Sequence, residues 1–218
     1  MKEKFEKIID EIADMILQIQ YLKTDINYLS DKKQPYFSEV VESSQFLHRA
    51  YWNSIKLLII DLNKLINPNE DFSLQKALNF VLSNRKKIEW ENEISIEEIK
   101  DLQVRITTIE NNHLTKIQNL RNKFYAHNDK KKYDFNIPIS LKECWEINEE
   151  LQLIFNKLHW HLRRQMFPIT EYAPKPEEII KLYRYKKIKK YVLEELVKNE
   201  LSTDLKNVQK IILGNEPA

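Results

Sequence analysis

SIEEIKDLQVRITTIENNHLTKIQNLRNKFYAH, residues 95–127, is the stretch that says most about the fold class. It begins with Ser95 and has Glu98 three residues later, which is the capping-box pattern of a helix N-terminus. Its apolar residues then recur at intervals of three and four positions, the spacing that places them on one face of a helix. The stretch therefore predicts a long amphipathic helix over 96–127.

The same periodicity continues on both sides of this stretch, and no alternation with a period of two indicates a strand. A second capping box starts at Ser140 with Glu143, and the prolines fall between periodic segments, where proline is tolerated. These patterns predict an all-α protein, namely an up-and-down helical bundle with a C-terminal helical extension. The predicted helices cover residues 3–29, 37–66, 73–88, 96–127, 141–167 and 177–199, with a short helix over 203–213.

Proline content also predicts how the chain is divided. The segment 168–176 contains three prolines and is typical of a stiff linker rather than a bundle turn. We therefore expect a helical bundle over 1–167, a proline-rich linker over 168–176 and a basic helical tail over 177–218.

Glycine is almost absent from the chain, since Gly214 is the single glycine among 218 residues. Glycine allows a positive φ angle and lets the backbone approach a phosphate closely. A Walker P-loop, a Rossmann turn, a kinase glycine loop and a nucleophile elbow all depend on it, so these classes are excluded. Any chemistry must therefore come from side chains on helices.

Charge and cysteine content limit the setting further. The net charge of +2 is too small to identify a partner. The single cysteine, Cys144, excludes an intrachain disulfide framework and a zinc site built from cysteines, and we expect it to be a buried structural thiol. The N-terminus lacks an apolar signal segment, and the longest apolar run, 57–60, is far too short to span a bilayer. We expect a cytoplasmic protein that does not associate with a membrane.

Metal and cofactor sites are not expected. His159 and His161 are two positions apart, so on a helix their side chains point about 200° apart and cannot chelate one ion. No other histidine has a suitably spaced partner, and paired glutamates such as Glu149 and Glu150 are typical of a solvated helix surface.

The densest polar cluster is NLRNKFYAHNDKKK, residues 119–132. His127 falls in a last helical turn, where the helix dipole favours imidazolium, and histidine has a reference pKa of about 6.5. Arg121 suits phosphate recognition, so the two could serve phosphodiester chemistry. On an ideal helix they lie about 120° apart, so they converge only if the helix distorts or a second subunit supplies its copy. The alternative is that His127 caps the helix and Arg121 pairs with a surface acid.

The same residues resemble a known family. Arg121, Asn122 and His127 fit the signature of the HEPN superfamily, an arginine, four to six residues and then a histidine, with a polar residue after the arginine. The stretch 120–129, LRNKFYAHND, is most similar to the abortive-infection AbiU-type branch, and the resemblance covers residues 1–167. Further similarity lies upstream, at Trp52, Leu57-Leu58-Ile59-Ile60, Asp61-Leu62, Lys64-Leu65 and Phe72-Ser73-Leu74.

The resemblance implies a helical bundle that dimerises, with two Arg–His motifs facing each other across a cleft for RNA. Many such proteins are metal-independent endoribonucleases, in which the 2′-OH attacks the adjacent phosphate and leaves a 2′,3′-cyclic phosphate. His127 would be the general acid or base, Arg121 would hold the phosphate, and Asn122 would orient the histidine or the substrate. In HEPN toxins controlled by a nucleotidyltransferase partner, a tyrosine two residues after the histidine is often the modified residue. Asp129 stands at that position, which argues against control by such a partner.

RNA contacts are expected beyond the motif. The basic run 181–190 has interleaved tyrosines, which suits phosphate contact and base stacking, although such runs are most often solvated helix faces. We predict that RNA is bound by Lys123, Lys130, Lys131, Lys132, Arg184, Lys186 and Lys187.

Three functions stay open at this point. The leading prediction is an endoribonuclease of bacterial defence or toxin type that acts as a homodimer, with an antitoxin or another defence-system partner. The first alternative is a non-catalytic helical module that binds RNA. The second is a regulatory adaptor that binds another protein through its helix faces.

Overall fold

The computed structural model describes residues 1–33, 41–42, 44–125 and 138–167, and positions 181, 185–186, 188–190 and 192–194. Every regular element in these residues is a helix, which confirms the all-α prediction. The predicted linker over 168–176 and the predicted helix over 203–213 lie outside the described residues, as does most of the predicted helix over 177–199.

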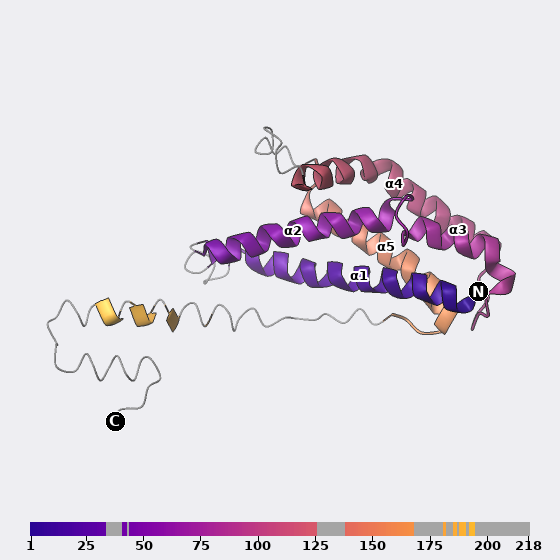
Figure 1. The fold of residues 1–218 in the computed structure, drawn as a ribbon, viewed down its shortest axis with the longest axis horizontal. Helices are drawn as coiled ribbons and strands as arrows, with labels where there is room; N and C mark the ends of the chain where they lie inside the picture. Colours follow the sequence, from indigo (N-terminus) through magenta and orange to yellow (C-terminus); the bar gives the residue numbers. More distant parts are fainter. Residues whose placement is uncertain are drawn as a thin grey trace, which may run out of the picture. The chain divides into compact units, whose positions relative to one another are not determined.

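The elements whose bounds the structure defines are five α-helices and one 3₁₀ turn. The longer helices α1, α2, α4 and α5 run in alternating directions, and the short helix α3 follows α2 in the chain and contacts α4 (Figure 1). This arrangement agrees with an up-and-down helical bundle. The elements are α1 (Lys2–Ser30), α2 (Gln45–Ile66), α3 (Leu74–Asn84), the 3₁₀ turn η2 (Arg85–Lys87), α4 (Ile96–Tyr125) and α5 (Leu141–Arg163).

The chain divides into two compact units. The first contains residues 1–27 and 50–174, and the second contains residues 28–49 and 175–218. The main hydrophobic core lies wholly in the first unit, where all five α-helices contribute to it. Among the helices that the structure describes, none combines the length and apolar composition needed to cross a membrane.

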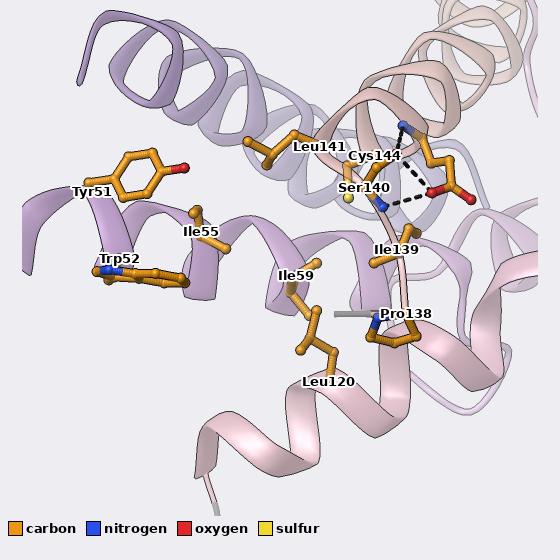
Figure 2. Close-up of a pocket in the computed structure, with 11 residues that line it drawn as sticks. Tyr51, Trp52, Ile55, Ile59, Leu120, Pro138, Ile139, Ser140, Leu141 and Cys144 are labelled. Atoms are coloured by element: carbon orange, nitrogen blue, oxygen red, sulfur yellow. Dashed lines mark hydrogen bonds between the residues drawn. The ribbon is translucent and has the colours of Figure 1, made fainter. Parts of the chain in front are cut away.

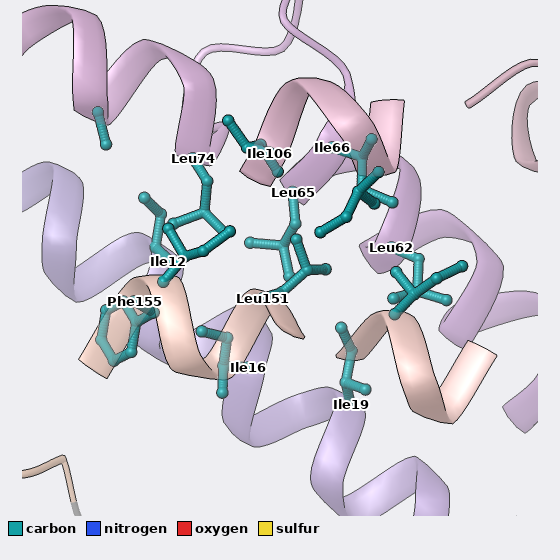
Figure 3. Packing of buried hydrophobic residues seen from close by; sticks show 14 of the residues in the cluster. Ile12, Ile16, Ile19, Leu62, Leu65, Ile66, Leu74, Ile106, Leu151 and Phe155 are labelled. Carbon is teal, nitrogen blue, oxygen red and sulfur yellow. The ribbon is translucent and has the colours of Figure 1, made fainter. Parts of the chain in front are cut away.

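The core consists of aliphatic side chains with a few aromatic rings among them. Burial of each large aliphatic or aromatic side chain contributes about 1.5–3 kcal/mol to folding. The helices therefore hold one another through the faces that the sequence periodicity marks as apolar. Figure 3 shows residues from several helices meeting in this core, including Ile12, Ile16, Ile19, Leu62, Leu65, Leu74, Ile106, Leu151 and Phe155.

Both predicted capping boxes are present. Ser95 Oγ accepts the Glu98 N–H at 3.1 Å, and Glu98 Oε2 accepts the Ser95 N–H at 3.2 Å. Ser140 and Glu143 form the same pair of bonds at the start of α5. These caps satisfy backbone donors that a helix N-terminus leaves free, so α4 and α5 begin where the sequence predicts.

The second helix is predicted over 37–66, and this is wrong for Glu42 and Ser44, because α2 begins at Gln45. The predicted start at residue 37 itself lies outside the described residues. Ser44 Oγ accepts the Leu47 N–H at 3.3 Å, and the Ser44 carbonyl oxygen accepts the His48 N–H at 2.9 Å. A serine side chain competes for backbone donors and so favours a helix end over a helix interior.

Two predicted helix ends are also wrong. For the helix predicted over 73–88, the α-helix α3 ends at Asn84 and a 3₁₀ turn follows it. The Asn84 Nδ2 donates to the Phe80 carbonyl oxygen at 2.9 Å. The helix predicted over 141–167 ends at Arg163, because Arg164 has a left-handed backbone with φ 50° and ψ 30°. The Arg164 N–H still donates to the Trp160 carbonyl oxygen, which closes the last turn.

The left-handed Arg164 predicts a stabilising substitution. A side chain with a Cβ is disfavoured in this conformation, and glycine adopts it without that penalty. We expect Arg164→Gly to raise the free energy of unfolding by about 0.5–1 kcal/mol. The measurement is the urea midpoint, with Arg164→Ala as the control that removes the side chain but keeps the Cβ. Equal midpoints for the two variants would contradict the explanation.

Candidate functional site

The last turn of α4 presents three of the predicted site residues. Ile117 and Leu120 on this part of the helix are buried, with 0% and 1% of their surfaces exposed, and they fix the rotation of the helix against the core. Arg121 and Lys123 are half-buried and Asn122 is exposed. The polar side chains therefore emerge at the end of α4, beside a buried apolar anchor.

Arg121 forms an ion pair with an acid, as the alternative reading of the sequence expects, but the sequence does not identify that acid as Glu70. Its guanidinium donates from one terminal nitrogen to Glu70 Oε1 at 3.2 Å, and the two side chains are 32% and 35% exposed. Asn63 Nδ2 donates to the same Glu70 oxygen at 3.3 Å, and Asn63 is fully buried. Glu70 thus joins α2, through Asn63, to the end of α4, through Arg121.

The loop between α2 and α3 holds Glu70 by its backbone. The Glu70 N–H donates to the Asn67 carbonyl oxygen at 3.0 Å, and the Asn67 N–H donates to the Asn63 carbonyl oxygen at 2.8 Å. Asn67 Oδ1 also accepts the Asn69 N–H at 3.0 Å, which is the side-chain turn typical of asparagine in loops. The position of the Glu70 carboxylate is therefore set by the loop as well as by its two donors.

The predicted site residues divide into three groups. Arg121, Asn122 and Lys123 lie together in one helical turn. Lys186 is exposed and belongs to the second unit. The other predicted site residues, which lie outside the described part of the chain, are His127, Lys130, Lys131, Lys132, Arg184 and Lys187.

A cavity of about 380 Å³ lies next to the last turn of α4. Its walls come from α2, α4 and α5 and from the segment just before α5. Figure 2 shows Tyr51 and Trp52 on α2, Leu120 on α4, and Cys144 on α5 near Ile139. The rings of Tyr51 and Trp52 meet edge to face, with centroids 5.7 Å apart. Because Leu120 directly precedes Arg121, this largely apolar cavity lies beside the charged end of α4.

The thiol in this cavity is not a nucleophile. Cys144 is 1% exposed, and burial, with a smaller contribution from the Glu143 charge, raises its pKa to about 12. The thiol is therefore protonated at neutral pH, whereas the thiolate is the reactive form. The expected role of Cys144 as a buried structural residue is confirmed.

Thiol labelling tests this assignment. At pH 8 we expect a disulfide reagent to modify native Cys144 at least about 100-fold more slowly than the urea-unfolded chain, since both burial and protonation oppose attack. Absorbance of the released thiolate measures both rates. Rapid modification of the native chain would contradict the raised pKa.

The two histidines near the end of α5 have separate structural partners. His159 Nδ1 lies 2.8 Å from the Gln165 carbonyl oxygen, and burial lowers the pKa of His159, which favours the neutral ring. His161 Nδ1 lies 2.8 Å from the Asn92 carbonyl oxygen, and its Nε2 lies 3.6 Å from Glu98 Oε1. Across the described residues, no group of three or more histidine, cysteine or acidic side chains is placed to hold a metal ion.

Comparison with known families identifies the relationship. The family model described as AbiU2 matches residues 2–183, which includes all the helices of the bundle. The chain belongs to the AbiU2 family of the HEPN superfamily. The all-α bundle agrees with this membership, and the family suggests a role connected with RNA and abortive infection. No curated protein and no solved structure matches this AbiU2 family member.

Proposed function

We propose that this AbiU2 family member is a metal-independent endoribonuclease of bacterial defence or toxin type, working in the cytoplasm as a homodimer. The main support is Arg121, a partly exposed guanidinium in the last turn of α4, within the Arg–His pattern of its superfamily. Arginine suits this role because it stays charged and can form two parallel hydrogen bonds to phosphate.

The proposed reaction is a transfer within the RNA strand. His127 removes the proton from a ribose 2′-OH, the 2′ oxygen attacks the adjacent phosphorus, and the bond to the 5′ oxygen breaks. A protonated His127, from the same copy or from the second subunit, donates a proton to that 5′ oxygen, so the products are a 2′,3′-cyclic phosphate and a 5′-OH. Arg121 stabilises the charge that develops on the phosphate, and Asn122 orients His127 or the substrate.

A dimer would meet the geometric requirement of this reaction. One straight helix places Arg121 and His127 on different sides, whereas two copies of the motif facing each other bring both kinds of side chain to one phosphate. We propose that the bundle over 1–167 forms this cleft and that the tail over 177–218 is an RNA-binding arm. RNA would be held by Lys123, Lys130, Lys131, Lys132, Arg184, Lys186 and Lys187 through salt-sensitive phosphate contacts.

The test is cleavage of RNA in the presence of EDTA by the wild type and by His127→Ala. We expect the wild type to produce fragments with 2′,3′-cyclic phosphate ends and the variant to produce none. Growth after induced expression provides the cellular counterpart, with toxicity expected from the wild type alone. The proposal fails if the wild type leaves RNA intact, or if His127→Ala cleaves it equally well.

A second function has one observation in its favour. Arg121 pairs with Glu70, which agrees with the alternative that this arginine pairs with a surface acid. A non-catalytic RNA-binding or protein-interaction module would retain this pair as a structural contact. Salt-sensitive RNA binding without cleavage would support the RNA-binding form. If Arg121→Ala and neutralisation of the 181–190 basic run were both silent in every RNA assay, a protein-interaction role would be favoured.

A further inference from the structure

The proposed phosphate-binding group already has an anion beside it. Glu70 Oε1 is 3.2 Å from an Arg121 terminal nitrogen, and the same oxygen accepts the Asn63 amide at 3.3 Å. A carboxylate oxygen with two converging N–H donors matches a phosphate oxygen in charge and in hydrogen-bonding capacity.

The contact is more specific than an ordinary surface ion pair. Most exposed pairs join two long side chains on open helix surfaces and contribute little to stability. Here Asn63 is fully buried, and the backbone of Glu70 is bonded to the Asn67 carbonyl oxygen. The hydrogen bonds of the loop therefore hold the Glu70 carboxylate in place beside Arg121.

We propose, on the basis of the function proposed above, that the Glu70 carboxylate occupies the phosphate position of Arg121 and that a nucleic-acid phosphate displaces it on binding. Glu70 is then a specificity-determining residue of the site. An anion must bind Arg121 strongly enough to displace the Glu70 carboxylate. A phosphate on a polyanionic strand is therefore bound in preference to a dilute small anion.

The exposure of the pair makes this exchange feasible. About a third of each side chain is exposed, at 32% for Arg121 and 35% for Glu70, so water and salt screen their attraction. A guanidinium has five N–H donors, and the contact with Glu70 engages one of its nitrogens. A phosphate that forms two parallel hydrogen bonds with Arg121 therefore gains more interaction free energy than is lost when the single contact with the carboxylate breaks.

The opposite role for Glu70 would be to orient Arg121 for catalysis. An orienting contact must persist in the complex, so its removal would lower kcat and would not tighten binding. A competing contact must break on binding, so its removal lowers Kd and KM. The two roles therefore predict changes of different kinds.

The experiment measures binding of a single-stranded DNA oligonucleotide, which has the phosphate backbone but no 2′-OH and cannot follow the proposed cleavage route. We expect Glu70→Gln to lower Kd by about threefold to fivefold in low salt, because it removes the negative charge that competes for Arg121. The amide oxygen can still accept the hydrogen bond from Asn63, so the loop should keep its position. The gain should shrink in high salt and disappear when Arg121→Ala is also present.

Asp71→Asn is the matched control. It removes the same charge from the next residue of the loop, where Asp71 is 90% exposed and pairs with Lys76 instead. Glu70→Asp is a second variant, which keeps the charge but shortens the reach to Arg121, and it should tighten binding less than Glu70→Gln. Thermal melts establish that each variant is folded.

The outcomes separate this inference from the proposed function. If Arg121→Ala weakens binding but Glu70→Gln does not tighten it, or if Asp71→Asn tightens it equally, the inference about Glu70 is overturned alone. If Arg121→Ala does not weaken binding, both the inference and the phosphate role of Arg121 are overturned. If binding behaves as expected but RNA is never cleaved, the inference holds and the nuclease proposal fails.

Discussion

Arg121→Ala is expected to reduce the rate of RNA cleavage by about 100- to 1000-fold, the usual effect of removing a group that stabilises developing charge in a transition state. The fold should survive, because Arg121 is 32% exposed and its pair with Glu70 contributes at most about 1 kcal/mol. Single-turnover cleavage of a short end-labelled RNA measures the rate, and circular dichroism verifies the helices.

The control for this experiment lies on the same helix. Arg105 is 31% exposed and pairs with Glu150, so Arg105→Ala removes an equivalent surface ion pair from α4. We expect its cleavage rate to stay within about twofold of the wild type, since surface pairs contribute little. Arg121→Lys should fall between the wild type and Arg121→Ala, because an ammonium keeps the charge but not the paired donors. Equal rates for Arg121→Ala and Arg105→Ala would rule out a catalytic Arg121.

Phe155→Ala is expected to lower the free energy of unfolding by about 3–5 kcal/mol. Phe155 on α5 is fully buried, its ring meets Phe167 edge to face at 5.2 Å, and it lies 5.6 Å from the His159 ring. Truncation would leave a cavity between α5 and its neighbours in the core. Urea unfolding followed by circular dichroism measures the loss.

Leu153→Ala provides the contrast for Phe155→Ala, because Leu153 is 51% exposed two residues earlier on the same helix. The helix propensities of leucine and phenylalanine differ by only about a few tenths of a kcal/mol, so the difference between the variants reports mainly burial. A change within about 0.5 kcal/mol is expected for Leu153→Ala. A comparable loss for the two variants would mean that the face of α5 is assigned incorrectly.

The helix starts could be predicted because their causes are local. Ser95 and Ser140 each meet a glutamate three residues later, and the resulting bonds depend only on that spacing. The predictions of helix at Glu42 and Ser44 and of a helix end at residue 167 are wrong for a related reason. Apolar periodicity continues past the true ends of these helices, so a prediction based on it makes them too long. It contains no signal for the cap at Ser44 or for the left-handed backbone at Arg164.

The site was predictable only in part. Arg121, Asn122 and Lys123 are adjacent in sequence and fit a family pattern, so the amino-acid sequence alone is enough to identify them. Glu70 is 51 residues away from Arg121, and no periodicity or spacing links a loop after α2 to the last turn of α4. Such a pair arises from the packing of the bundle, and a single sequence does not contain that information in local form.

The buried Cys144 has a practical consequence for studying the proposed dimer. Because the chain has no other cysteine and this one is expected to be inert, a cysteine introduced on the surface becomes the sole reactive thiol without any background substitution. Asn122→Cys would place a spin label or a crosslinker on the exposed face of the last turn of α4. The separation of two such probes would then measure how the two copies are arranged in the proposed dimer.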